Sequence, residues 1–157
     1  MAQVKPVPEG YHSVTPYLVV DGAGKAIDFY RRAFGAIERF RMPAPDDKVG
    51  HAEIQIGDSV IMLSDPFPEM GSPAPSGAAG SAFGLMIYVP DVDALFKQAV
   101  DAGATVTMPL DNQFWGDRYW KLRDPFGHSW HLATHIEDVS PEEMSKRAEA
   151  AFAGARE

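Results

Sequence analysis

The 157-residue sequence contains no cysteine, which excludes disulfide bonds, thiolate metal ligands and cysteine nucleophiles. No apolar run approaches the roughly 20 residues of a membrane-spanning helix, and the N-terminal stretch MAQVKPVPEGYH lacks the apolar segment of a signal peptide. A glycine-rich phosphate loop is also missing. We therefore expect a cytoplasmic protein that does not interact with membranes.

Basic residues are fewer than acidic ones: the sequence contains 14 Lys and Arg and 22 Asp and Glu, which gives a net charge of −8. This charge repels nucleic acid phosphates, so nucleic acid is excluded as a partner. It favours a neutral or cationic small-molecule ligand, although an acidic surface that only maintains solubility is the simpler explanation.

The most informative stretch is HAEIQIGDSVIMLSDP, residues 51–66, which predicts a hairpin. Polar and apolar residues alternate from His51 to Ile56, as in a half-buried strand. Gly57-Asp58 suits a type II′ turn, with the glycine first. The register then places Ile56 opposite Ser59, Gln55 opposite Val60, Glu53 opposite Met62 and His51 opposite Ser64.

The two faces of this hairpin differ in character. One face is apolar and ready to pack on a helix; it consists of Ala52, Ile54, Ile56, Ile61 and Leu63. The other mixes imidazole, carboxylate, amide and thioether groups; it consists of His51, Glu53, Gln55, Val60, Met62 and Ser64. We interpret the second face as the wall of a ligand cavity, with an ordinary solvated sheet face as the alternative.

The whole chain divides into five segments. These are an extended arm (1–12), a first unit (13–66), a Pro-, Gly- and Ser-rich segment (67–81), a second unit (82–135) and a C-terminal helix (136–157) opened by a Ser140-Pro141-Glu142-Glu143 capping box. Strands are expected at 13–20, 37–42, 83–89, 105–108, 118–123 and 129–134, and helices at 25–34 and 92–102. The 67–81 segment is either a tether or a lid over the cavity.

Both units follow the order strand, helix, strand, strand, strand. Their helices end alike, with Ala33-Phe34-Gly35-Ala36 in the first unit and Asp101-Ala102-Gly103-Ala104 in the second. Two copies indicate a duplicated supersecondary unit rather than a solenoid. The sequence therefore predicts an α+β fold in which tandem βαβββ units form curled mixed sheets around a cavity.

This duplicated unit resembles the vicinal oxygen chelate superfamily, which includes glyoxalase I, extradiol dioxygenases, and bleomycin- and fosfomycin-resistance proteins. The matching residues are Ile27–Tyr30, Phe34-Gly35 and Asp124–His128. The stretches HAEIQIGDSVIMLSD and MPLDNQFWGDRYWKLRDPFGHSWHLATH are similar to its PhnB-like branch. The resemblance covers residues 13–135. It implies the glyoxalase/bleomycin-resistance fold, a homodimer and a site that binds a small molecule. Antibiotic resistance is one role of proteins in this superfamily.

The resemblance also implies where a metal would bind, namely at Thr15, Met62, Gly84 or Leu85, and His131, which stands where a glutamate is usual. Only His131 is a good ligand, so we expect no metal or other cofactor at this site. As an alternative, His51 and Glu53, with His131 or Gln55 as the third ligand, hold Zn, Ni, Mn or Fe at a displaced site.

Two further groups of residues are candidates for chemistry. His51 and Glu53 form either a catalytic base with its orienting carboxylate or a packing pair. The loop around Trp115, Arg118 and Trp120 either binds planar or cationic ligands or fills a dimer interface or the barrel.

Three functions follow from these features. The first is a metal-free protein that sequesters an aromatic or cationic compound in a pocket lined by His51, Glu53, Gln55, Met62, Trp115, Arg118, Trp120 and His131. The second is a metal-dependent lyase, isomerase or dioxygenase that uses His51, Glu53 and His131. The third is a structural or regulatory dimer whose cavity is filled by side chains.

Overall fold

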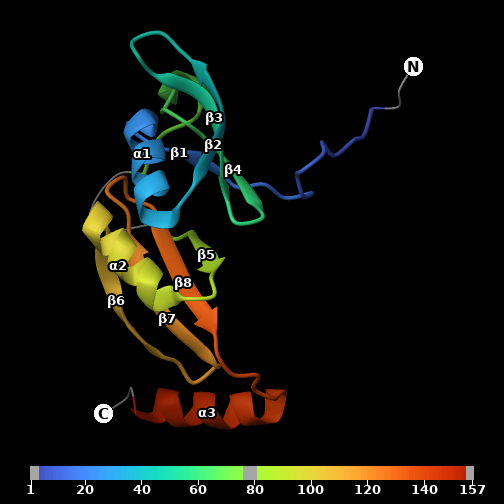
Figure 1. Ribbon diagram of the computed structural model, residues 1–157, viewed down its shortest axis with the longest axis vertical. Coiled ribbons are helices and arrows are strands. Elements are labelled where there is room, and N and C mark those ends of the chain that lie inside the picture. The colour runs from blue at the N-terminus through green and yellow to red at the C-terminus, as the bar shows by residue number, and fades with distance from the viewer. Residues whose placement is uncertain (1–3, 76–80, 155–157) are drawn as a thin grey trace. The chain divides into compact units, whose positions relative to one another are not determined.

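The computed structural model describes residues 4–75 and 81–154 (Figure 1). The elements are β1 (Tyr17–Val19), α1 (Ala23–Phe34), β2 (Ile37–Pro43), β3 (Val49–Ile56), β4 (Ser59–Ser64), the 3₁₀ helix η1 (Pro68–Met70), β5 (Gly84–Tyr88), α2 (Val92–Ala102), β6 (Thr105–Asn112), β7 (Asp117–Arg123), β8 (Ser129–His135) and α3 (Pro141–Gly154). They form two compact units. Unit 1 spans Met1–Ala78 and Pro125–Gly127, and unit 2 spans Ala79–Asp124 and His128–Glu157. The predicted α+β class and duplicated βαβββ order are confirmed.

Unit 1 has a four-stranded mixed sheet in the order β1-β4-β3-β2. β1 runs parallel to β4, and the other pairs are antiparallel. The predicted hairpin register is confirmed, since Ile56 opposes Ser59 and Glu53 opposes Met62. At the turn, Gly57 has φ 58° whereas Asp58 does not have a positive φ, as a type II′ turn requires.

The core of unit 1 lies between its sheet and α1, which runs along one face (Figure 1). Residues of α1 that recur every three or four positions are buried there, among them Ile27, Phe29 and Tyr30. They meet the apolar hairpin face, in which Ile54 and Leu63 are fully buried. Each large apolar side chain removed from water in this way contributes roughly 1.5–3 kcal/mol. The helix ends where Gly35 adopts the left-handed conformation, at φ 67°.

Prolines shorten one predicted strand and interrupt another. β1 begins at Tyr17 rather than Ser13, because Pro16 has no N–H for the ladder; its carbonyl still accepts a hydrogen bond from the Met62 N–H at 2.9 Å. β6 runs to Asn112 instead of ending at Met108. Register shifts on both sides of Met108 accommodate Pro109 in this edge strand.

The segment predicted as an unstructured tether or lid begins with ordered residues. Phe67 and Ser72 form an isolated antiparallel β-bridge, and Pro68–Met70 forms a single 3₁₀ turn. Residues 76–80 of this segment lie outside the described part of the chain, so its role as tether or lid stays a prediction.

Unit 2 repeats the topology, with sheet order β5-β8-β7-β6. Asp91 is the N-cap of α2, as the sequence predicts, and its carboxylate accepts a hydrogen bond from the Ala94 N–H at 3.0 Å. The rings of Phe96 on α2 and Trp120 on β7 meet edge to face at 4.6 Å. Trp130 is fully buried on the same side of the sheet.

α3 lies across one end of the sheet of unit 2 (Figure 1). Ser140 caps it, accepting the Glu143 N–H at 3.2 Å. Arg147 anchors it through two contacts to Glu137, at 2.8 and 2.9 Å, and through a hydrogen bond to the Phe114 carbonyl at 3.2 Å. Among the described residues, no helix is long and apolar enough to cross a membrane.

Candidate functional site

The open face of the unit 1 sheet, opposite α1, carries four of the eight residues that the sequence selects. His51, Glu53 and Gln55 alternate along β3 with the buried residues of the core. Met62 on β4 pairs with Glu53 on one side and with Tyr17 on the other. The structure thus brings His51, Glu53 and Met62 together on one surface.

A hydrogen-bonded cluster lies at the centre of this face. The Tyr11 hydroxyl donates to Glu53 Oε2, and the Tyr17 hydroxyl lies 3.1 Å from His51 Nδ1. His51 Nε2 lies 3.5 Å from Glu53 Oε1, and the Glu53 side chain is only 15% exposed. The hydrogen bond to Glu53, followed by burial, raises the pKa of Tyr11, which therefore remains a donor at neutral pH.

Aromatic and thioether side chains surround the cluster. Tyr17 is 50% exposed and Phe40 is 51% exposed, and their rings lie 5.6 Å and 6.3 Å from that of His51. Met42 pairs directly with His51 across the strands. A carboxylate among accessible aromatic rings is an arrangement that attracts organic cations.

Sequence reasoning missed three contributors to this face. Phe40 faces Glu53 only because β2 has a bulge between Glu38 and Phe40, which shifts the alternation of the strand. Tyr17 could have been found from its position on β1 next to Met62. Tyr11 lies 42 residues from Glu53 in a stretch without periodicity, so no sequence signal indicates the contact.

Gln55 lies on the open face as predicted, but it contributes less to the candidate ligand site than its position suggests. Its amide nitrogen donates to the Gly57 carbonyl of its own turn at 3.0 Å. The side-chain amide therefore forms a hydrogen bond within the hairpin turn and is not directed at the His51–Glu53 cluster.

The open face of unit 2 carries His131. Its Nδ1 lies 2.5 Å from the Tyr119 hydroxyl. Burial, followed by the nearby charge of Lys121, lowers the pKa of His131, and burial together with Tyr88 raises the pKa of Tyr119. The lowered pKa favours the neutral imidazole, in which one ring nitrogen carries a proton and the other accepts a hydrogen bond.

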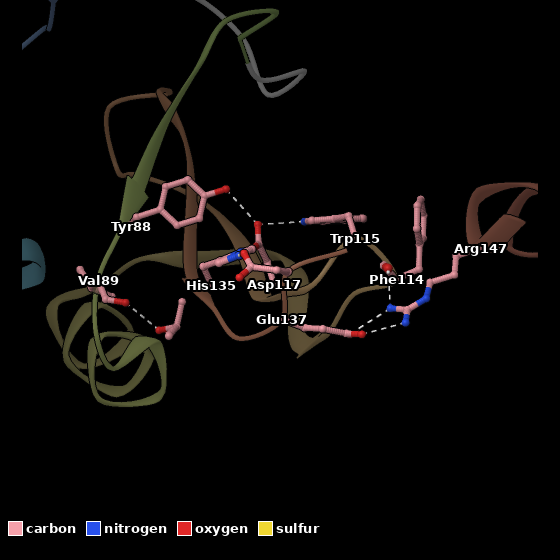
Figure 2. Close-up of polar contacts among 10 residues, drawn as sticks. Tyr88, Val89, Phe114, Trp115, Asp117, His135, Glu137 and Arg147 are labelled. Carbon is pink, nitrogen blue, oxygen red and sulfur yellow. Dashed lines mark hydrogen bonds and ion pairs between the residues drawn. The ribbon is translucent and has the colours of Figure 1, made fainter. Parts of the chain in front are cut away.

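Trp115 belongs to a second cluster, centred on Asp117, which is 2% exposed. Asp117 accepts hydrogen bonds from the Tyr88 hydroxyl at 2.9 Å and the Trp115 indole N–H at 3.0 Å, and it lies 2.8 Å from His135 Nδ1 (Figure 2). The neighbouring Gly116 has φ 98°, and a Cβ there would lie 2.1 Å from the Glu137 carbonyl oxygen. In this structure Trp115 ties the loop to the sheet.

Arg118 and Trp120 lie on the opposite side of the unit 2 sheet from His131. Arg118 forms a bidentate ion pair with Asp93 of α2, at 2.6 and 2.7 Å, and Trp120 is fully buried against Phe96. Strand alternation explains this placement, since even-numbered residues of β7 face the helix and odd-numbered residues face away. Neither side chain is presented to a ligand on the open face.

The residues at the metal-ligand positions implied by the resemblance do not fit a metal ion. Thr15 and Met62 offer a hydroxyl and a thioether, which are poor ligands for hard or borderline divalent ions. At Gly84 a Cβ would lie 2.6 Å from His131 Nε2, so His131 occupies the space of a side chain there. Within residues 4–75 and 81–154, no group of three or more His, Asp or Glu could hold a metal.

The displaced alternative draws on both units. His51 and Glu53 lie in unit 1, and His131 lies in unit 2. His51 and Glu53 together supply two ligands, fewer than a stable divalent site needs.

Comparisons with known proteins agree with these features. The family model of the Glyoxalase/Bleomycin resistance protein/Dioxygenase superfamily matches residues 10–132. An uncharacterized protein of Mycobacterium tuberculosis is 44% identical over 135 residues, which cover 84% of this chain and 79% of that protein.

Solved structures show the same fold. TioX from Micromonospora sp. ML1 is 28% identical, with a TM-score of 0.63, and the match covers 80% of this chain and 99% of TioX. A PhnB protein from Bacillus cereus has a TM-score of 0.62 at 18% identity, over 78% of this chain and 99% of that chain. The chain described here therefore belongs to the Glyoxalase/Bleomycin resistance protein/Dioxygenase superfamily, the vicinal oxygen chelate superfamily.

Proposed function

We propose that this protein binds and sequesters a small aromatic cation on the open face of unit 1, without a metal. The observation that carries the proposal is the Glu53 carboxylate, which is held by Tyr11 and lies beside His51 among accessible aromatic rings. Superfamily membership is compatible with this function, and also with catalysis, because the fold hosts many activities.

Electrostatics favour a cation at this position. Glu53 is mostly shielded from water, so its attraction for a charged ligand is screened less than that of a surface carboxylate. The guanidinium of Arg39 lies over the Tyr11 ring, at 5.4 Å, a cation–π contact of the kind proposed for the ligand. The net charge of −8 adds a long-range attraction for cationic ligands.

Shape and polarity favour an aromatic ligand. The half-exposed rings of Tyr17 and Phe40 offer flat apolar surface beside the carboxylate. Such rings contribute roughly 0.5–1.5 kcal/mol per aromatic contact beyond the burial of area. A planar cation uses the rings and the carboxylate together.

The proposal is tested with two probes that share one ring system and differ in charge and in a single N-methyl group: N-methylacridinium and, at mildly alkaline pH, neutral acridine. We expect the cation to bind at least about tenfold more tightly in fluorescence titration, as a cation–π contact plus a shielded carboxylate predicts. In Glu53→Gln, which keeps the shape of the side chain, this preference should disappear.

Glu38→Gln is the matched control. Glu38 lies on the same sheet, but it pairs with Ile54 on the opposite face and forms an ion pair with Arg41. Its substitution should leave the preference for the cation unchanged. Equal affinity of the wild-type protein for both probes, or equal loss in the control, would contradict the proposal.

A further inference from the structure

The duplicated fold places side chains of opposite charge at matching positions of the two open faces. In unit 1, Glu53 on β3 opposes Met62, which in turn pairs with Tyr17 of β1. In unit 2, Lys121 on β7 opposes His131, which pairs with Met86 of β5. Lys121 thus occupies in unit 2 the position that Glu53 occupies in unit 1.

Lys121 is a half-buried cation without a counter-ion. Its backbone pairs with β6 and β8, but its ammonium group forms no hydrogen bond or ion pair with any residue that the structure describes. Two carboxylates lie on the same face, but Asp117 is engaged by Tyr88, Trp115 and His135, and Asp111 opposes Tyr119 without reaching Lys121. The Lys121 ammonium thus has no partner of opposite charge among the described residues, and an anionic ligand group would complement it.

His131 adds a second donor next to Lys121. The Tyr119 hydroxyl lies at Nδ1, and when it donates to Nδ1 the ring proton lies on Nε2. Nε2 faces Gly84, where the missing side chain makes room for it. No acceptor for this N–H lies among residues 4–75 and 81–154, and the atom is not sealed from solvent.

We propose that Lys121 and His131 form an oxyanion site on the open face of unit 2, which binds the carboxylate or phosphonate group of a small molecule. Directly opposed residues of an antiparallel pair have Cβ atoms about 5 Å apart, so an ammonium and an imidazole N–H can both donate to one anionic group. Such charge-assisted hydrogen bonds are short and strong. The site goes beyond the cation-binding function, which concerns unit 1.

The test uses phenylphosphonate and benzoate as anionic probes and benzamide as the neutral control. Binding is measured by calorimetry, and its position by the NMR signals of the His131 ring. We expect at least one acid to bind more tightly than benzamide and to shift the His131 signals. Whichever acid binds more tightly identifies the preferred oxyanion.

Variants separate the site from general charge effects. Lys121→Gln should weaken binding of the acid roughly 10- to 100-fold, the range expected for loss of a charged donor, whereas Lys121→Arg should retain most of it. The control is Lys97→Gln, since Lys97 on α2 is already paired with Asp101 at 2.6 Å. Equal binding of all three probes, or equal weakening in Lys97→Gln, would overturn the proposal.

The cation site of unit 1 and the oxyanion site of unit 2 are tested by different variants, so either proposal can fail while the other stands. Glu53→Gln should leave phenylphosphonate binding unchanged, and Lys121→Gln should leave N-methylacridinium binding unchanged. If Glu53→Gln abolished binding of the acids as well, Lys121 and His131 would not form a separate site.

Discussion

At the scale of single residues, His135 is the group whose ionisation should be visible in stability. Its two ring nitrogens lie 2.9 Å from Asp138 and 2.8 Å from Asp117. These hydrogen bonds, with the Asp138 contact first and Asp117 second, raise the pKa of His135 above its ordinary value. Folding therefore favours the charged imidazolium, and its contribution is screened because the side chain is half exposed.

The sign of the pH dependence follows from this direction. Stabilisation by His135 is complete below its unfolded pKa of about 6.5 and is lost as pH rises through the higher folded value. We expect His135→Gln to melt at a lower temperature than wild type in mildly acidic buffer and at nearly the same temperature in alkaline buffer. His12→Gln, on the exposed arm, is the control; a difference that grew with pH would contradict the assignment.

At the scale of secondary-structure elements, Asp65 joins α1 to the sheet. Its buried carboxylate accepts hydrogen bonds from the N–H groups of Gly22 and Ala23, at 2.9 and 3.1 Å, and from that of Val49 at 2.7 Å. Gly22 cannot cap the helix with a side chain, so Asp65 does so from 42 residues away. A carboxylate here also complements the positive end of the helix dipole.

Removal of this carboxylate leaves three backbone donors without their partner. We expect Asp65→Ala to lower the free energy of unfolding by about 2–4 kcal/mol, more than the loss of a single cap. Chemical denaturation measures the change, and Asp58→Ala at the exposed hairpin turn should alter stability by less than about 0.5 kcal/mol. Similar losses in both variants would show that Asp65 does not hold α1.

At the scale of the whole molecule, the metal question decides between the sequestering protein and a metal-dependent lyase, isomerase or dioxygenase. Because Thr15, Met62 and Gly84 are poor ligands or none at all, we expect well under one metal ion per chain in protein purified without chelator or affinity tag. Soaking with Zn, Ni, Mn or Fe should not change this. Near-stoichiometric metal that is lost in the His51→Ala, Glu53→Ala double variant would instead favour the enzyme.

The homodimer and the cytoplasmic location stay predictions, and light scattering in solution tests the first.

The sequence by itself determined the elements and the family. Alternation from His51 to Ile56 and the Gly57-Asp58 turn sufficed for the hairpin register, and the repeated helix endings predicted two βαβββ units. These features depend on periodicity and on backbone conformations that glycine and proline impose locally, so they can be read without knowledge of the fold.

Only the tertiary structure decided which side chains meet. Tyr11 reaches Glu53, and Asp65 caps α1, across about 42 residues each, and no local pattern encodes such a distance. The aromatic loop illustrates the same limit: Trp120 and Lys121 are neighbours in sequence, yet strand alternation buries the first in the core and presents the second on the open face. The sequence selects Trp120 as a site residue and passes over Lys121, whereas the pleat of β7 and its pairing with β8 assign them to opposite sides of the sheet.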